Sequence, residues 1–340
     1  MKILAIETSC DETSASVIEN GRNILSNVIS SQIPIHAVYN GVVPELASRA
    51  HIKNINIVIE ESLNKAGIDF KNFDKKIDAV ACTYGPGLAG SLLVGIMAAK
   101  TLAYIYDKPL IPVNHIEGHM YSAGIENHSL KPPFLSVIIS GGHTELIMVK
   151  DYGKYIFLGG TRDDAVGEAF DKVAKILGLA YPGGPVIDKL AELGDAKKVY
   201  FTRPLLKGSW DFSFSGIKTA VLNYSKKVDV KNKKTVNDIC AGFRQAVCET
   251  VVYKAFQAVE KYNLKTLALG GGVASNSLMR KMFKEAGKNK KIKVFIPSPV
   301  YCTDNASMIG LAAYYKYKKS AYGKNNASLN PEPSLDLQNW

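Results

Sequence analysis

The sequence predicts an α/β protein made of two related domains, each built on a largely parallel sheet with helices on both faces. Three observations lead to this prediction. The chain has 340 residues and is 46% hydrophobic, which is enough for two ordinary cores. Short apolar runs typical of strands alternate with longer helical runs. The order of these runs is the same in both halves of the chain.

The first copy begins with three strands and continues into a strand–helix–strand unit. Asn20-Gly21 separates two alternating runs, which is typical of a hairpin. An apolar strand at 76–84 enters Gly85-Pro86-Gly87 and is followed by a helical run. The expected strands are 2–9, 13–19, 23–30, 76–84 and 109–113, with the helix at 91–106.

The second copy repeats that order after residue 130. Its expected strands are 133–140, 144–150, 155–160, 265–272 and 293–299. Residues 161–263 interrupt this copy and look mostly helical. We therefore expect an N-terminal domain at 1–130, completed by a helix at about 304–320, and a second domain at 131–303. The polar tail at 321–340 is expected to be loosely held.

Composition excludes several classes of protein. No run of eighteen or more apolar residues is present, so no membrane span is expected, and the N-terminus does not resemble a signal peptide. Cytoplasmic localisation follows as the expectation. The five cysteines form no C-x-x-C pair and are expected to be small buried thiols.

The net charge of +11 favours an anionic partner, with nucleic acid the first candidate. Lysines gather at 226–234 and 284–293. A solvated surface explains each cluster as well as RNA binding does, so the charge counts only together with other observations.

Turn segments follow three of the predicted strands: CDETS, SGGHTE and GGGVASNS, of which the last two contain glycines. Loops that follow parallel strands open on one edge of a sheet, where ligands bind. Glycines let backbone amides approach an anion, and GGGVASN is expected to open a helix, which suits a phosphate site. No phosphate-binding G-x-x-x-x-G-K-[ST] motif is present.

A pair of histidines predicts a metal site. His115 and His119 lie four residues apart and share one face of a helix. Glu117 falls about 200° around that helix from His115, so zinc-protease chemistry does not follow. Asp304 follows the corresponding strand of the second copy, and a His-His-Asp set suits Fe(II) or Zn(II) between the domains. Helix capping or surface pairing of the histidines, and an N-cap role for Asp304, remain open alternatives.

Eight motifs in order give the sequence a resemblance to a known family along nearly its whole length. They are ETSCDETSASV, NHIEGHMYS, SGGHTEL, GEAFDKVAK, YPGGP, DFSFSGIKTAV, GGGVASN and CTDNASM. The chain resembles the bacterial tRNA N6-adenosine threonylcarbamoyltransferases, the TsaD type, once labelled glycoproteases because of their HxxxH segment. PELASRAH is similar to the bacterial branch. The resemblance implies a duplicated actin/sugar-kinase-like fold with two domains around a central cleft.

The resemblance also implies a reaction and its participants. The threonylcarbamoyl group moves from threonylcarbamoyl-AMP (threonylcarbamoyl-adenylate) to N6 of adenosine 37 in tRNAs that read codons beginning with A, and AMP is released. Implied protein partners are a TsaB-type paralogue and a TsaE-type ATPase. One divalent metal is implied, Fe2+ first and Zn2+ second, held by His115, His119 and Asp304.

The remaining site residues are carried over by motif. Asp11 and Glu12 would lie near the reacting group, with Asp11 the candidate general base. The adenylate would be bound by Ile138, Ile139, Ser140, Gly141, Gly142, Asp171, Gly184, Asp188 and Asn276.

Other readings stay open at this point. Asp171 can instead pair with Lys175, Asn276 can cap a helix, and Phe212 and Phe214 fit a core better than a base-stacking site. A metal-dependent peptidase, an ATP-dependent small-molecule kinase and a non-catalytic RNA-binding scaffold are the alternative functions.

Overall fold

The structure is a computed structural model that describes residues 1–206, 208–319 and 328–340. The chain divides into two compact units. Unit 1 comprises Met1–Ser129, Asp151–Tyr155 and Thr303–Trp340, and unit 2 comprises Leu130–Lys150 and Ile156–Cys302. In the described part of the chain, no helix has the length and apolar character needed to cross a bilayer.

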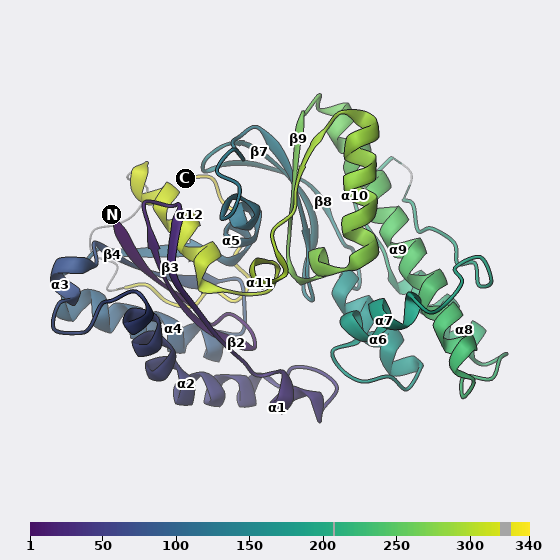
Figure 1. Cartoon of the computed structure of the whole chain (residues 1–340), viewed down its shortest axis with the longest axis horizontal. Coiled ribbons are helices and arrows are strands. Elements are labelled where there is room, and N and C mark those ends of the chain that lie inside the picture. Colours follow the sequence, from purple (N-terminus) through teal and green to yellow (C-terminus); the bar gives the residue numbers. More distant parts are fainter. Residues whose placement is uncertain (207, 320–327) are drawn as a thin grey trace. The chain divides into compact units, whose positions relative to one another are not determined.

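Unit 1 contains a five-stranded sheet in the order β3-β2-β1-β4-β5 (Figure 1). The first three strands pair antiparallel, whereas β4 and β5 continue the sheet parallel to β1. Asn20 and Gly21 both have positive φ, which confirms the predicted hairpin between β2 and β3. The strands are β1 (Lys2–Glu7), β2 (Glu12–Glu19), β3 (Asn23–Ser31), β4 (Ala79–Gly85) and β5 (Leu110–Asn114).

Helices cover both faces of this sheet. Alternate residues of β1 point to opposite faces. Leu4 and Ile6 join the core with α2 (Pro44–Lys65) and α4 (Ala89–Ile105). On the other face α12 (Ala306–Lys318) crosses so closely that a Cβ on its Gly310 would lie 2.7 Å from Ile18. The shorter helices of the unit are α1 (Ile33–Ala37), α3 (Phe73–Lys76), α5 (His115–Tyr121) and the 3-10 turn η1 (Ser122–Gly124).

Unit 2 contains a second five-stranded sheet, in the order β10-β9-β6-β7-β8. Read from the other end, the order matches that of unit 1, and so do the directions of the pairs β6–β7, β6–β9 and β9–β10. The predicted duplication is therefore present in the topology. The strands are β6 (Phe134–Ile139), β7 (Thr144–Asp151), β8 (Lys154–Gly160), β9 (Thr266–Gly270) and β10 (Lys293–Phe295).

The helices of unit 2 pack around one large core that contains Phe212 and Phe214, both fully buried, as the sequence predicts. The described residues of 161–263 contain the helices α6 (Val166–Ile176), α7 (Gly183–Ala191), α8 (Ser215–Ser225) and α9 (Lys233–Lys261). The 3-10 turn η2 (Gly272–Ser275), α10 (Ser277–Lys290) and α11 (Pro299–Cys302) follow β9 and β10. All five cysteines are free thiols.

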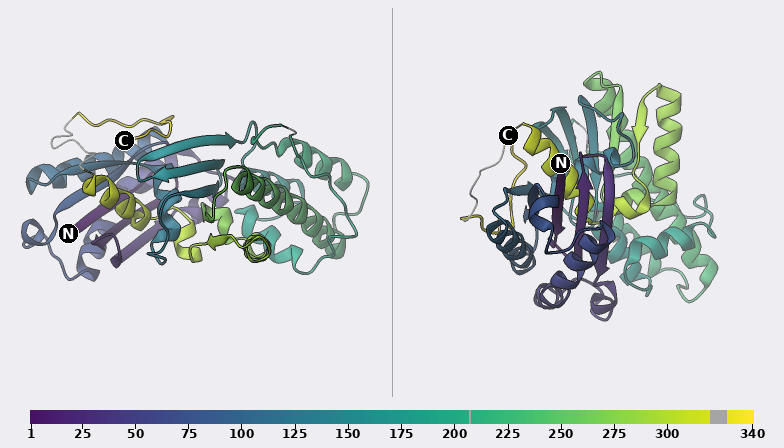
Figure 2. Two further views of the ribbon diagram at one scale, coloured as in Figure 1. Left: turned by 90° about the horizontal axis from the view of Figure 1, so that it is seen from above. Right: turned by 60° about the vertical axis from the view of Figure 1, so that its left-hand side comes forward.

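The prediction of a loosely held tail is wrong for residues 328–340. Leu335 is buried, and backbone bonds tie this segment to β4 and to the turn after β7. Trp340 donates its backbone N–H to the carbonyl of Gly153 at 2.9 Å. In the left view of Figure 2 the yellow C-terminal segment runs along unit 1. Residues 321–327 of the predicted tail lie outside the described residues, and so does residue 320 of the predicted helix.

Candidate functional site

Two histidines open the helix that follows the edge strand of the first sheet. β5 ends at Asn114, whose side chain caps α5 by accepting from the N–H of Ile116 at 2.8 Å. Because α5 starts at once, His115 and His119 occupy one face of it, with ring centroids 4.6 Å apart. Both side chains are buried.

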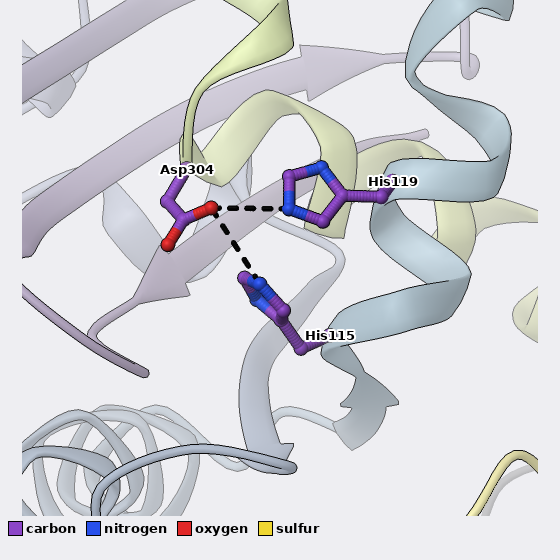
Figure 3. Close-up of side chains that lie close together, drawn as sticks. All are labelled: His115, His119 and Asp304. Carbon is purple, nitrogen blue, oxygen red and sulfur yellow. Dashed lines mark hydrogen bonds and ion pairs between the residues drawn. The ribbon is translucent and has the colours of Figure 1, made fainter. Parts of the chain in front are cut away.

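Asp304 completes the set from the start of α12. Its Oδ1 lies 3.1 Å from Nε2 of His119 and 3.5 Å from Nε2 of His115, as Figure 3 shows. The N-cap of α12 is Asn305, which accepts from the N–H of Met308, so the capping role considered for Asp304 is wrong. All three side chains belong to unit 1, because Asp304 lies in the segment that returns to the first sheet.

The donor set fits a divalent metal. One ligand atom from each of the three residues lies within 4.8 Å of the other two. Metal–nitrogen and metal–oxygen bonds of about 2.1 Å place neighbouring ligand atoms roughly 3 to 3.5 Å apart. The distances from Asp304 to the two histidines, 3.1 and 3.5 Å, match this spacing. Two imidazoles and one carboxylate suit Fe(II) and Zn(II).

A buried carboxylate that sequence analysis missed lies behind His115. Glu7, the last residue of β1, is fully buried, and its Oε2 lies 3.4 Å from Nδ1 of His115. Ser9 contributes its hydroxyl at 3.1 Å from the same nitrogen. The available signal was an acidic residue that ends an otherwise apolar strand, at the sheet edge where β5 also ends.

These charges perturb one another. Burial lowers the pKa of an imidazole, but the carboxylates of Asp304 and Glu7 outweigh burial and raise the pKa of His115 to about 9. Burial acts to raise the pKa of Glu7, yet His115 holds that pKa below its ordinary value. Burial lowers the pKa of His119. Two carboxylates therefore surround one imidazolium, and the excess negative charge favours a cation.

Among the described residues, the hydrogen-bond and ion-pair partners of Glu117 do not include His115 or His119. Its carboxylate accepts from Tyr155 Oη at 2.9 Å and from the indole N–H of Trp340, and it lies 3.2 Å from the ammonium of Lys316. The prediction that Glu117 points away from the metal ligands is confirmed.

Asp11 and Glu12 follow β1 on the first turn, near the same site. Burial raises the pKa of Glu12 well above its ordinary value, and the charges of Asp11 and Asp304 add to this shift. The charge of the predicted metal ligand Asp304 therefore acts on Glu12, one member of the predicted catalytic pair.

In unit 2, the SGGH turn leaves β6 beside the start of α6. Ile138 and Ile139 are buried side chains of β6, so only their backbone can meet a ligand. A Cβ on Gly141 or on Gly142 would meet nothing within 4 Å, which leaves open space above the turn.

Asp188 and Asn276 lie together, as expected for one site. Asp188 accepts from Asn276 Nδ2 at 2.8 Å, from the N–H of Ser277 at 2.9 Å and from the buried guanidinium of Arg244 at 2.7 Å. Asn276 also caps α10 by accepting from the N–H of Met279 at 3.0 Å, which confirms the capping interpretation, whereas its contact with a nucleotide stays a prediction. The first amides of α10 are therefore partly occupied by protein groups, and Arg244 is a second residue that sequence analysis missed.

Asp171 meets Gly183, the neighbour of Gly184, at the start of α7. Asp171 accepts from the N–H of Gly183 at 2.7 Å. A Cβ on Gly184 would meet nothing within 4 Å. The carboxylate of Asp171 is thus fixed against the YPGGP turn, next to an open glycine.

The family model and the similar sequences carry the same name. The family described as TsaD, tRNA N6-adenosine threonylcarbamoyltransferase, matches residues 23–311. A tRNA N6-adenosine threonylcarbamoyltransferase of Endomicrobium trichonymphae is 65% identical over 340 residues, covering 100% of this chain and 99% of the relative. One from Clostridium perfringens (strain SM101) is 52% identical over 337 residues, covering 98% of each.

Similar solved structures agree on the fold. HypF of T. kodakarensis superposes with a TM-score of 0.66 at 15% identity, over 95% of this chain and 49% of that one. Component A of the (R)-2-hydroxyglutaryl-CoA dehydratase of Acidaminococcus fermentans gives a TM-score of 0.54 at 17% identity, over 94% and 99%. The architecture is the duplicated actin/sugar-kinase-like fold, as predicted.

Proposed function

The chain belongs to the tRNA N6-adenosine threonylcarbamoyltransferase family, and we propose that His115, His119 and Asp304 hold the metal of that reaction. The enzyme is an acyltransferase that modifies tRNA by transferring a threonylcarbamoyl group to N6 of an adenosine. The single observation that carries the metal assignment is the convergence of two buried imidazoles on one oxygen of Asp304.

The donor in this proposal is threonylcarbamoyl-AMP, and the metal is Fe2+, with Zn2+ the second choice. A bound divalent cation supplies Lewis-acid polarisation of the carbonyl that is transferred. The chain's own residues fix its position: the helical spacing of His115 and His119 sets two ligands, and Asn305 orients the start of α12 that carries Asp304.

The adenylate would be bound by groups of unit 2. The open SGGH turn offers backbone amides at Gly141 and Gly142 to the phosphate as AMP leaves. Carboxylates suit ribose hydroxyls, and Asp171 and Asp188 supply them. Backbone groups of Ile138, Ile139 and Ser140, with Gly184 and Asn276, complete the proposed pocket. Arg244 positions Asp188 through its buried guanidinium.

Asp11 and Glu12 are proposed to act on the amine. The adenine N6 must lose a proton when the new bond to the carbamoyl carbon forms, so a base nearby favours the reaction. Burial and the neighbouring charge of Asp11 raise the pKa of Glu12 well above its ordinary value, so its carboxylate holds a proton more strongly than an exposed one, and Asp11, the candidate base, lies beside it. The variants Asp11→Asn and Glu12→Gln identify the base, because only the variant that removes the base should change the pH profile of kcat.

Partners and location are also proposals. The net charge of +11 suits a polyanionic substrate, because phosphate contacts supply most non-specific affinity for nucleic acid. We propose that the substrate is adenosine 37 of tRNAs that read codons beginning with A, that a TsaB-type paralogue and a TsaE-type ATPase assist, and that the reaction takes place in the cytoplasm.

A peptidase on the same site is disfavoured. The glutamate of the HxxxH segment is bound by Tyr155, Lys316 and Trp340, so it does not serve as a base for metal-bound water. Sugar-kinase chemistry is disfavoured by imidazole ligands, because Mg2+ prefers oxygen.

The test uses synthetic threonylcarbamoyl-AMP and unmodified tRNA, with and without the two proposed partner proteins. Nucleoside mass analysis reports N6-threonylcarbamoyladenosine, and the same samples are assayed for bound metal. Product with wild-type protein, and none with His115→Ala, supports the proposal. Equal product from both proteins would overturn the metal assignment.

A further inference from the structure

Glu7 is a fully buried acid whose carboxylate is held on three sides. Its Oε1 accepts from the N–H of Ser9 at 2.6 Å. Its Oε2 accepts from the hydroxyl of Thr83, at the end of β4, and lies 3.4 Å from Nδ1 of His115. The carboxylate therefore links the ends of three neighbouring strands, β1, β4 and β5.

The two ring nitrogens of His115 face different groups. Nε2 lies 3.5 Å from Asp304, on the side of the other proposed metal ligands, whereas Nδ1 faces Glu7 and the hydroxyl of Ser9. A histidine that binds a metal through one nitrogen donates the proton on its other nitrogen to an acceptor, and that bond fixes the ring. Glu7 also accepts from the backbone N–H of Ser9, so it holds in place the second group that faces Nδ1.

Charge balance gives a second, independent argument. A divalent cation held by two neutral imidazoles and Asp304 leaves one positive charge uncompensated in a buried site. Burial of an unpaired charge is unfavourable, so a second carboxylate close by stabilises the loaded form. Glu7, fully buried, meets this need through His115.

We infer that Glu7 is a positioning residue of the metal centre: it orients His115 through Nδ1 and supplies the second negative charge that the bound cation requires. The inference rests on the proposed metal assignment. It does not make Glu7 a ligand, because His115 lies between its carboxylate and Asp304.

The experiment measures metal affinity of the full chain in the absence of tRNA and donor. Fe2+ is titrated anaerobically against a competing chelator, and Co2+ is bound as a spectroscopic probe. Glu7→Gln keeps the shape of the side chain and removes its charge. Its dissociation constant for Fe2+ is expected to rise about 10- to 100-fold, with a changed Co2+ d–d band.

Thr83→Val is the matched control, because it removes a hydrogen bond to the same carboxylate without altering charge. It should lower the melting temperature of the metal-free protein as much as Glu7→Gln does, while its metal affinity stays within about threefold of wild type. A purely structural role for Glu7 predicts equal metal affinities in the two variants, and that result would overturn the inference.

Two further variants keep the outcome clear. His115→Ala must bind metal more weakly than wild type; if it does not, the metal assignment itself fails, which is a separate failure from that of Glu7. Glu7→Asp retains the charge and should lie between wild type and Glu7→Gln in affinity. If Glu7→Gln does not fold without metal, Glu7→Asp carries the test, and an unchanged affinity and Co2+ spectrum would overturn the inference.

Discussion

Nε2 of His119 lies 3.1 Å from Oδ1 of Asp304, although 185 residues separate them in sequence. The contact exists because α12 returns to the first sheet and packs against β1 and β2, with Ala306 bound to the hydroxyl of Ser14. The start of α12 therefore lies beside the edge where β5 ends and α5 begins. The three proposed metal ligands therefore all come from unit 1.

Removing either member of this contact should stop tRNA modification. We expect His119→Ala and Asp304→Ala to lose bound metal and at least about 100-fold of the transfer rate, because a metal with two remaining ligands is weakly held. Metal content and the yield of modified nucleoside are measured on the same preparations, and circular dichroism checks the fold.

Glu285→Ala, on the exposed side of α10, is the control for a lost carboxylate and should keep both metal and activity. Full modification by the Asp304→Ala protein, after treatment with a chelator, would contradict the assignment.

Periodicity and turn chemistry were sufficient for the plan of the fold. Asn20-Gly21 predicted the hairpin, and the repeated order of strands predicted two sheets of one topology. The helical spacing of His115 and His119 predicted a shared face, and the displaced position of Glu117 excluded a protease base.

Long-range packing could not be predicted in the same way. Glu7 is the polar last residue of a strand, and only the register of β1, β4 and β5 brings it to His115. The composition of residues 328–340 suggests a mobile tail. Its order comes instead from backbone bonds to β4 and from one indole that reaches Glu117.

Glu117 should matter for stability and not for chemistry. Glu117→Ala leaves the ammonium of Lys316 buried without its carboxylate, which is expected to cost about 3 to 5 kcal/mol in the free energy of unfolding. Glu117→Gln should keep its metal and most of its transfer activity. Urea unfolding in a Trp210→Phe background reports unit 1 through Trp340, the other of the two tryptophans.

A double-mutant cycle with Lys316→Met checks the cause. The double variant Glu117→Gln with Lys316→Met should be less destabilised than the sum of the two single variants, because no unpaired charge remains. Loss of transfer in a folded, metal-loaded Glu117→Gln protein would restore a catalytic role for this residue.

Asp164 predicts a pH dependence of the stability of unit 2. Burial acts to raise its pKa, but ion pairs with Lys172 at 2.5 Å and Lys218 at 2.6 Å lower it below the ordinary value. A lowered pKa in the folded state means that the stabilisation is complete above the unfolded pKa of about 3.9 and is lost as the pH falls below it.

Wild type should exceed Asp164→Asn by about 1 to 3 kcal/mol in the free energy of unfolding at pH 7. The difference should shrink when the pH falls below about 4. In a Trp340→Phe background, the fluorescence of Trp210 reports unit 2 during urea unfolding. A difference that stays constant from pH 7 to pH 3 would show that the ion pairs are not its source.

Gly167 tests the proposed adenylate turn without touching it chemically. A Cβ at this position would lie 2.7 Å from the carbonyl oxygen of Ser140 and 2.8 Å from Cα of Gly141, so backbone must shift. We expect Gly167→Ala to displace the SGGH turn and raise the KM for threonylcarbamoyl-AMP about 10-fold, since a small misplacement of binding groups is costly. Gly216→Ala, on α8 with nothing within 4 Å, is the matched control and should leave KM unchanged. Alanine favours a helix over glycine, so Gly167→Ala is not expected to unfold α6. Steady-state kinetics over a range of donor concentrations measures KM. An unchanged KM in a folded Gly167→Ala protein would mean that the turn does not bind the donor.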